Sequence, residues 1–439
     1  MSNEPAEHSL RSLCLLVVDC PHATPKWTDS GVVVLRNQNI KGGRLDLSSP
    51  SFTDEEHYQG RVRRAVPQGG DIVMTREAPM GDVCQIPQGL RCCVGQRQVL
   101  LRPDPKKVDG RFLLFALQSP YLQRQIGWNE GTGSTVSNLR IPVLEALRVP
   151  TPSLPDQIEI AATLGALDDR IALLRETNTT LEAIAQALFK SWFVDFDPVR
   201  AKQQGLAPAG MDEATAALFP DSFEESTLGL VPKGWRMVAL AEAFEINPSR
   251  PFLKKGATGA YLDMASLATS GHCVEPPVQR EFGSGTKFRN GDTLLARITP
   301  CLENGKSAFV DFLAEDQVGW GSTEFIVLRP RAPLPVYLGY LLCRHPPFRE
   351  HAIHSMSGTS GRQRVQNDVL GRYSLAQPGE AIVLAFADIV APIQAAIARN
   401  HATSATLATL RDTLLPRLIS GQLRLPLAQE AIAEATHAD

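Results

Sequence analysis

The clearest pattern in the chain is a pair of long segments in which apolar residues recur at alternating steps of three and four. The first seam runs through Leu164, Leu167, Ile171, Leu174, Asn178, Leu181, Ala185, Leu188 and Trp192. The second runs through Phe386, Ile389, Ile393, Ala396, Asn400, Thr403, Leu407, Leu410 and Leu414. Such a narrow seam is typical of coiled-coil helices rather than of a helix with a broad globular face. The pattern therefore predicts two long helices that pair with each other in an antiparallel coiled coil.

Each seam is interrupted by an asparagine at the same heptad position, Asn178 in the first and Asn400 in the second. A seam asparagine lowers stability but fixes the register, because only one alignment lets two amides pair. We expect Asn178 and Asn400 to lie near each other; the alternative is that each side chain points to solvent. Pro392 in the second seam predicts either a bend or a helix that restarts with the proline in its first turn.

Outside the seams, the chain repeats itself. Residues 70–79 (GDIVMTREAP) return as residues 291–300 (GDTLLARITP), and residues 99–103 (VLLRP) return as residues 326–330 (IVLRP). Gly131-Thr132-Gly133 likewise returns as Gly358-Thr359-Ser360-Gly361. The period of roughly 225 residues is too long for a solenoid and is the size of a domain plus a connector. The chain is therefore predicted to hold two similar modules, which can bind two targets at a fixed separation.

Each predicted module mixes short strands, turns and helices. Buried strands are indicated at residues 72–74, 99–101, 294–296 and 325–328, and helices at residues 111–126 and 336–351. The expected fold class is α+β, with the two modules alternating with the two long helices. The expected boundaries are 1–154 and 233–378 for the modules, 155–197 and 379–425 for the helices, 198–232 for a linker and 426–439 for a tail.

Charge separates the modules from the connectors. Residues 1–154 hold 18 basic and 15 acidic side chains, and residues 233–377 hold 17 and 13. Residues 155–232 hold 5 and 13, and residues 378–439 hold 4 and 6. Mildly basic modules on a chain of net charge −3 are a weak indication of nucleic-acid binding.

The composition also indicates a compartment. The eight cysteines form no CxxC pattern, which favours reduced thiols and a cytoplasmic protein. No apolar run approaches the roughly 18 residues of a membrane span, and the polar N-terminus lacks the apolar core of a signal peptide. We therefore expect a cytoplasmic protein that does not associate with a membrane.

Several motifs resemble those of the specificity subunits of type I restriction–modification systems. Residues 187–198 (ALFKSWFVDFDP) are similar to that family's first conserved region, and residues 410–421 (LRDTLLPRLISG) resemble its C-terminal counterpart. Residues 19–36, with the repeated segment 70–79, resemble a target recognition domain. In the second module, Gly291-Asp292, residues 297–301 and Asn304-Gly305-Lys306 resemble another common form of that domain.

The resemblance implies a DNA-reading scaffold that is itself non-catalytic. Each target recognition domain would contact one half of a bipartite site in double-stranded DNA, and the paired helices would set the gap between the halves. A helix of about 38 residues is roughly 57 Å long, which exceeds one DNA turn of about 34 Å. The family implies two methyltransferase (modification) subunits and restriction/translocase subunits as partners. The complex would be an adenine-specific DNA methyltransferase and type I endonuclease, with S-adenosylmethionine, ATP and Mg bound by the partners and no cofactor by this chain.

Residues that read DNA are expected in the repeated loops. Arginine reads guanine and asparagine or glutamine reads adenine, whereas lysine, serine and threonine hold phosphates. For each residue the alternative is a solvated loop side chain. The candidates in the first module are Lys26, Arg36, Arg76, Thr132, Ser134 and Asn138. Those in the second are Arg297, Thr299, Asn304, Lys306, Ser307, Thr359, Ser360, Arg362, Gln363 and Arg364.

Signals for an enzyme are present but incomplete, so we expect no catalytic residue and no metal site. Gly305-Lys306-Ser307 ends like a P-loop, but Pro300 stands where the first glycine belongs. His345-Pro346-Pro347-Phe348 echoes an amino-methyltransferase motif without its amide or carboxylate. His345, His351 and His354 lack a further metal ligand. The two rival readings are a stand-alone DNA-modifying enzyme and a coiled-coil adaptor whose modules bind proteins.

Overall fold

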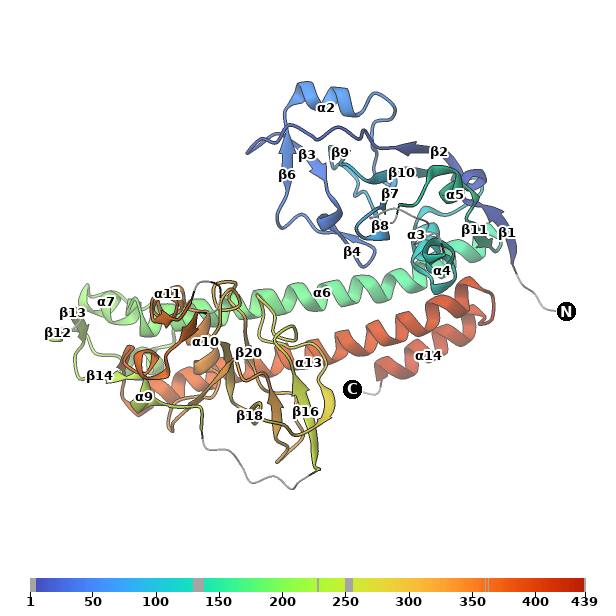
Figure 1. The fold of residues 1–439 in the computed structure, drawn as a ribbon. Coiled ribbons are helices and arrows are strands. Elements are labelled where there is room, and N and C mark those ends of the chain that lie inside the picture. Colours follow the sequence, from blue (N-terminus) through green and yellow to red (C-terminus); the bar gives the residue numbers. More distant parts are fainter. Residues whose placement is uncertain are drawn as a thin grey trace. The chain divides into compact units, whose positions relative to one another are not determined.

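Two helices of 40 residues each carry the apolar seams, α6 (Leu154–Phe193) and α13 (Glu380–Ile419). In the computed structural model, which describes residues 5–128, 138–226, 229–248, 256–359, 361 and 363–437, the chain divides into two compact units. One unit comprises residues 1–172 with residues 405–439, and the other comprises residues 173–404. Each unit therefore contains one module together with one part of α6 and one part of α13 (Figure 1).

In the second unit the two helices run antiparallel, because Asn178 of α6 contacts Asn400 of α13 and the later Trp192 contacts the earlier Phe386. Asp168 of α6 pairs with Arg411 of α13 in the first unit, with 2.6 Å between Oδ1 and Nη1. In the second unit Trp192 packs on Phe386, with 5.5 Å between the ring centroids. Residues later in α6 therefore contact residues earlier in α13. The predicted α+β fold with an antiparallel helix pair is confirmed.

Most residues of the first predicted seam are buried, but only a third of those in the second are. In α6, six of the nine seam residues are buried: Leu164, Leu167, Ile171, Leu174, Ala185 and Trp192. In α13, Phe386, Leu407 and Leu414 are buried as predicted, but Ile389 is 37% exposed. Val390, Ile397 and Ser404 are buried between them. After the predicted seam residues Phe386, Ile393 and Asn400, the next buried residue is therefore four positions further on, not three.

Helix α13 continues through Pro392, so the alternative of a restart there is wrong. Pro392 is exposed. Among the described helices, α13 is also long and apolar enough to cross a membrane, which corrects the expectation that no segment reaches this length. The residues that make it so apolar include Ile382, Val383 and Val390, and all three belong to the hydrophobic core of the second unit.

The first module is built on a four-stranded sheet with a smaller sheet beside it. The central sheet has the order β2 (Cys14–Asp19), β10 (Gln98–Pro103), β7 (Ile72–Arg76) and β8 (Met80–Gln85). The smaller sheet has the order β6 (Ser51–Thr53), β3 (Val32–Leu35) and β9 (Cys92–Val94). The remaining elements are β1 (Ala6–Ser9), α1 (Leu10–Leu13), η1 (Asn37–Asn39), β4 (Ile40–Lys41), β5 (Arg44–Leu45), α2 (Glu55–Arg61), α3 (Gly110–Gln118), α4 (Pro120–Gly127), α5 (Ile141–Ala146) and β11 (Arg148–Thr151).

The second module repeats this plan. Its central sheet has the order β15 (Phe244–Ile246), β22 (Phe325–Pro330), β19 (Thr293–Ala296) and β20 (Ser307–Phe309). Its second sheet has the order β17 (Val278–Glu281), β16 (Thr258–Leu262), β21 (Gly319–Gly321) and β18 (Thr286–Phe288). The other elements are β14 (Arg236–Ala239), α9 (Leu240–Ala243), α10 (Leu338–Arg344), α11 (Pro346–His354), β23 (Met356–Ser357), β24 (Arg364–Val365), α12 (Asn367–Leu370) and β25 (Ser374–Gln377).

Each of the single helices predicted at residues 111–126 and 336–351 is two helices. Pro120 opens α4 and Pro346 opens α11. Proline lacks the amide hydrogen that the middle of a helix requires and is favoured in the first turn. Residues 198–232 hold helices α7 (Asp197–Gln203) and α8 (Glu213–Leu218) and a hairpin of β12 (Phe223–Ser226) and β13 (Gly229–Pro232). After α13 the chain forms α14 (Leu425–His437).

The sequence repeat marks the same buried ion pair in both modules. Arg102 donates from Nε and Nη2 to the two carboxylate oxygens of Asp71, both at 2.8 Å. Arg329 does the same to Asp292 at 2.7 and 2.9 Å. Both aspartates are buried, and a bidentate arginine is the geometry that best compensates a buried carboxylate. The repeated Gly-Asp and Leu-Arg-Pro segments are thus the two halves of one structural clamp.

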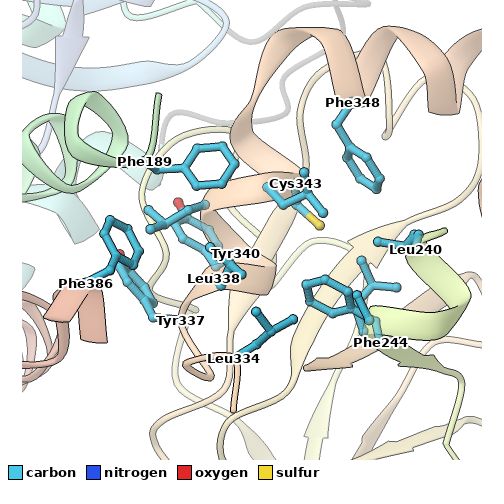
Figure 2. Close-up of a cluster of buried hydrophobic side chains, with 14 of the residues drawn as sticks. Phe189, Leu240, Phe244, Leu334, Tyr337, Leu338, Tyr340, Cys343, Phe348 and Phe386 are labelled. Carbon is cyan, nitrogen blue, oxygen red and sulfur yellow. The ribbon is translucent and has the colours of Figure 1, made fainter. Parts of the chain in front are cut away.

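One large core cluster of the second unit joins its module to the long helices. Figure 2 shows Phe189 of α6 and Phe386 of α13 pointing toward Tyr337 and Tyr340, and all four are buried in one cluster. The hydroxyl of Tyr340 donates to Glu182 of α6 at 2.6 Å. Gln394 of α13 donates to Asp311 of the module at 2.7 Å. The module is therefore held on the helices by both apolar and polar contacts.

Candidate nucleic-acid interface

In the second module the structure brings four predicted residues together beside the end of β19. The amide and hydroxyl of Thr299 lie 3.2 and 3.4 Å from the carbonyl oxygen of Gln363. Arg297 donates from Nη2 to the carbonyl of Val365 at 2.6 Å. Arg364 donates from Nε and Nη2 to Glu324 at 2.6 to 3.0 Å. We call Arg297, Thr299, Glu324, Gln363 and Arg364 the second loop cluster.

The corresponding end of β7 in the first module holds another polar group. Asn138 donates to the Glu77 carboxylate at 2.6 Å, and Arg97 lies 3.3 Å from the same carboxylate. Arg76 donates to Asp19 and, at 3.2 Å, to the side-chain oxygen of Asn138. We call Asp19, Arg76, Glu77, Arg97 and Asn138 the first loop cluster.

Arg76 and Arg297 hold equivalent pieces of backbone. Arg76 donates from Nε to the carbonyl of Leu139 at 2.8 Å, just as Arg297 donates to that of Val365. The backbone amides of Leu139 and Val365 return a hydrogen bond to the carbonyls of Arg76 and Arg297. Arg76 is only 7% exposed and donates from all three of its nitrogens. The expectation that Arg76 reads a base is therefore corrected, because its donors already hold the loop.

Two further candidates of the second module are also engaged inside the protein. Ser307 lies in β20 and is 1% exposed, so it cannot reach DNA and that expectation is wrong. Lys306 donates from Nζ to the carbonyl of Met264 at 2.7 Å, which ties the loop to the second sheet. Asn304 and Thr359 are exposed. Their side chains are accessible to a ligand.

The remaining candidates of the first module lie on its surface. The side chain of Lys26 is 62% exposed and its Nζ is 3.1 Å from Asp54. The Arg36 guanidinium lies 5.2 Å from the ring centroid of Trp27, which is itself 46% exposed. Thr132, Ser134, Ser360 and Arg362 lie outside the residues that the structure describes.

Electrostatics in the second loop cluster favour charged side chains. The hydrogen bonds from Arg364 hold the pKa of Glu324 below its usual range. Glu324 in turn raises the pKa of Arg364. The pair is therefore fully ionised at neutral pH, and it fixes the direction of the guanidinium at the surface.

Sequence reasoning missed the acidic partners that position the arginines. Glu324 follows no repeated motif, and Glu77 stands where the second copy has Ile298. Trp27 was also missed, although it follows the predicted contact residue Lys26 directly. These acids could have been expected on chemical grounds, because an arginine that is held in one orientation for DNA contact needs a hydrogen-bond acceptor nearby. Their positions along the chain gave no indication of them.

The two seam asparagines lie in contact in the second unit. Asn400 donates from Nδ2 to the side-chain oxygen of Asn178 at 2.9 Å. Asn178 donates from its own Nδ2 to the carbonyl of Ile397 at 3.1 Å. Both side chains are partly buried, so the alternative in which each points freely into solvent does not describe this pair.

No group of three or more His, Cys, Asp or Glu side chains with the spacing of a metal site occurs among the described residues. His345 is buried, and burial lowers its pKa. His351 lies with its Nε2 3.3 Å from the carbonyl of Val369. Both histidines are therefore accounted for by packing and local hydrogen bonding within the second module.

Comparison with known proteins identifies the modules. Residues 27–183 match the model of the type I restriction modification DNA specificity domain. The chain belongs to the type I restriction–modification specificity subunits. It is 25% identical over 372 residues to the MjaIX specificity subunit of Methanocaldococcus jannaschii, covering 81% of this chain and 78% of that one. It is 24% identical over 423 residues to the HindI specificity subunit of Haemophilus influenzae, covering 83% and 88%.

A solved structure supports the same fold. The crystal structure of a type I restriction-modification S subunit from M. genitalium aligns with 95% of this chain and 97% of its own, with a TM-score of 0.54 and 16% sequence identity. At this identity the likeness concerns the fold. The family match and the curated relatives, rather than this likeness of fold, identify the modules as the target recognition domains of a specificity subunit, with DNA as the ligand class.

Proposed function

We propose that this specificity subunit reads a bipartite DNA target, with one half-site bound by each loop cluster. The observation that carries the proposal is the relation between the two clusters. The same Asp–Arg clamp and the same arginine-to-backbone contact support both of them. The polar side chains at the surface differ, with Glu77 (partly exposed), Arg97 and Asn138 in one cluster and the partly exposed Gln363 and Arg364 in the other. A constant frame with different polar side chains suits two domains that read different sequences.

In this proposal the chain itself is non-catalytic and works in the cytoplasm as an assembly scaffold. Two methyltransferase subunits and the restriction/translocase subunits join it, and they supply adenine methylation and DNA cleavage. S-adenosylmethionine, ATP and Mg are bound by those partners. The partly buried asparagine pair supports a fixed helix register, which a scaffold that spaces two half-sites requires.

The direct test is to map methylated adenines across the genome in cells with and without this chain. We expect one bipartite motif to lose methylation when the chain is absent. An Arg364→Gln variant should relax one base position in one half of that motif and leave the other half unchanged, whereas Arg97→Gln should affect the opposite half.

Purified chain mixed with duplex DNA, Mg²⁺ and S-adenosylmethionine provides the control for the rival enzyme reading. Methylation or cleavage without any partner would overturn the proposal. If the chain binds its partners but its deletion leaves the methylated motif unchanged, the result would favour the protein-binding adaptor.

A further inference from the structure

One face of the sheet that accompanies the central sheet carries different side chains in the two modules. The β6-β3-β9 sheet of the first module and the β17-β16-β21-β18 sheet of the second can be aligned on matching hydrogen bonds. These run from the amide of Gly95 to the carbonyl of Leu35 and from the amide of Ser322 to the carbonyl of Leu262. In this alignment the cross-strand pair Val34–Cys93 of the first module corresponds to the pair Tyr261–Trp320 of the second. A small apolar pair has therefore been replaced by two aromatic rings.

In the first module this face is covered by helix α2. Val34 and Cys93 are buried together with Tyr58 and Val62, which come from α2 and its C-terminal end. In chain order, the second module has strand β18 in the place of α2. Because β18 extends the sheet sideways, it adds a strand instead of a cover.

In the second module the face carries a row of side chains across all four strands. Val278, Tyr261, Trp320 and Lys287 are cross-strand partners in sequence from β17 to β18. The rings of Tyr261 and Trp320 are 4.6 Å apart. Val278 is 54% exposed, and both rings are partly exposed. The row is thus an aromatic surface that water reaches.

Two cations lie on these rings. The Arg280 guanidinium is 4.4 Å from the ring centroid of Tyr261. The Lys287 ammonium is 5.0 Å from that of Trp320 and also donates to the carbonyls of Gly283 and Gly285 at 2.6 and 2.9 Å. Cation–π contact orients a cation without using its hydrogen-bond donors. The cations are therefore held in place on the outside of the sheet.

Part of this surface retains its hydrogen-bonding capacity. Within the described part of the chain, the Arg280 guanidinium and the Tyr261 hydroxyl donate no hydrogen bond to the protein. The surface also borders the second loop cluster. Lys306 joins the loop to Met264, just after β16, and Thr286 of β18 lies 3.4 Å from the carbonyl of Phe325, next to Glu324.

We infer that this face of the β17-β16-β21-β18 sheet binds the sugar–phosphate backbone of duplex DNA beside the half-site that the second loop cluster reads. The inference rests on the proposed function. Arginine and tyrosine donors are suited to phosphate oxygens, and phosphate contacts position a protein on DNA without reading its sequence. The exposed rings offer apolar surface to the sugars. The charge of the face complements DNA, and its place beside the loop cluster lets one duplex reach both.

The test is the salt dependence of DNA binding by the full chain in complex with its modification subunits. Anisotropy titrations would compare wild type with Arg280→Gln and with Tyr261→Phe, on a duplex that contains the methylated motif and on one that lacks it. Removing one phosphate contact should reduce the slope of log K against log salt by about 0.9. Arg280→Gln should therefore weaken binding to both duplexes by the same factor, roughly tenfold, and Tyr261→Phe by a smaller factor.

Arg91→Gln in the first module is the matched control. Arg91 also lies on a tyrosine ring, 4.5 Å from the centroid of Tyr58, but it donates to Glu55 at 2.6 and 2.9 Å. Since the Glu55 carboxylate already pairs with the charge of Arg91, loss of Arg91 should leave the salt slope unchanged. Thermal unfolding of each variant would verify that the fold is intact.

The outcomes separate this inference from the proposed function. A wild-type slope in Arg280→Gln, with the preference for the motif retained, overturns the inference alone. Loss of the modification subunits from Arg280→Gln with an unchanged slope would identify the face as a protein contact and also overturn it. A wild-type complex that shows no preference for the motif would instead contradict the proposed function.

Discussion

The two target recognition domains share a frame and differ in what they place upon it. Both have the same central sheet order, and both hold it with a buried aspartate and a bidentate arginine. They differ on the outer sheet, where one has the helix α2 over a small apolar pair and the other has exposed aromatic rings and cations. They differ again in their loop clusters. The comparison teaches that the repeated motifs in the sequence identify the frame, and we expect the residues that contact DNA to be among those that do not repeat.

The largest expected effect comes from breaking the shared frame. Asp292→Ala should destabilise the second unit by about 3 kcal/mol, because Arg329 would be left largely buried without its partner. Asp71→Ala should have a similar effect in the first module, where Arg102 has the same role. Urea unfolding would measure both.

The control for this prediction is Asp311→Asn, which changes an acid of the second module that lies outside the clamp. Equal losses of stability in Asp311→Asn and Asp292→Ala would show that the clamp has no special role. A large loss of stability in only one module would show that the clamp stabilises the two modules unequally, although its geometry is the same in both.

The second prediction concerns the helix pair, which both modules share. Asn178→Ala should lower the free energy of unfolding by about 1 to 2 kcal/mol, since it leaves the amide of Asn400 without its acceptor. Replacing both residues by leucine should restore or exceed the wild-type stability while weakening the register. Calorimetry would measure the stability, and chemical cross-linking of introduced cysteines the register. An unchanged register in the double variant would refute the role assigned to the pair.

A third prediction sharpens the difference between the loop clusters. Arg364→Gln should reduce affinity for the target roughly tenfold and relax one base position of one half-site. Arg76→Gln should reduce stability rather than specificity, because Arg76 is buried and holds the loop through Leu139. Binding assays on a library of single-base variants of the target would separate the two. A sequence-selective change in Arg76→Gln with unchanged stability would contradict this assignment.

The smallest effect is a pH dependence in the second loop cluster. The pKa of Glu324 is lowered by Arg364, so the contribution of this pair is fully present above the ordinary pKa of a glutamate, about 4.3. It is lost as the pH falls through the lowered value. Since the side chain of Arg364 is 43% exposed, the effect on global stability should be slight. NMR titration of the Glu324 carboxylate should show its pKa return toward the ordinary value in Arg364→Gln, and an unchanged titration would contradict the pairing.

Much of the fold followed from periodicity, and what failed did so for physical reasons. The seam of α6 was largely predictable, although the apolar neighbour Phe189 is buried in place of the seam residue Leu188. In α13 the adjacent pairs Ile389–Val390 and Ala396–Ile397 are both apolar, so the sequence does not show which member of each pair faces the partner helix. Packing against neighbouring elements determines it. The breaks before α4 and α11 were visible as Pro120 and Pro346 but were read as part of single helices.

The contact residues were less predictable than the fold. Thr299, Gln363 and Arg364 do meet in one place, because a bridge joins Ile298 to Arg364. Arg76 and Ser307 had the right chemistry but point into the protein, and the sequence holds no sign of their burial other than their place within strands. The ionic partners Glu324 and Glu77 depend on contacts between segments that are distant along the chain.

The unit that holds the first domain is completed by residues 405–439, which are far away in the sequence. Asp168 finds its partner Arg411 there, and Leu407, Leu414 and Leu418 are buried in the same stretch. The second unit is one continuous stretch, residues 173–404, so all of its residues are synthesised before the last residues of the first unit. A ribosome that stalls before residue 405 would therefore release a chain whose earliest-made domain still lacks its support.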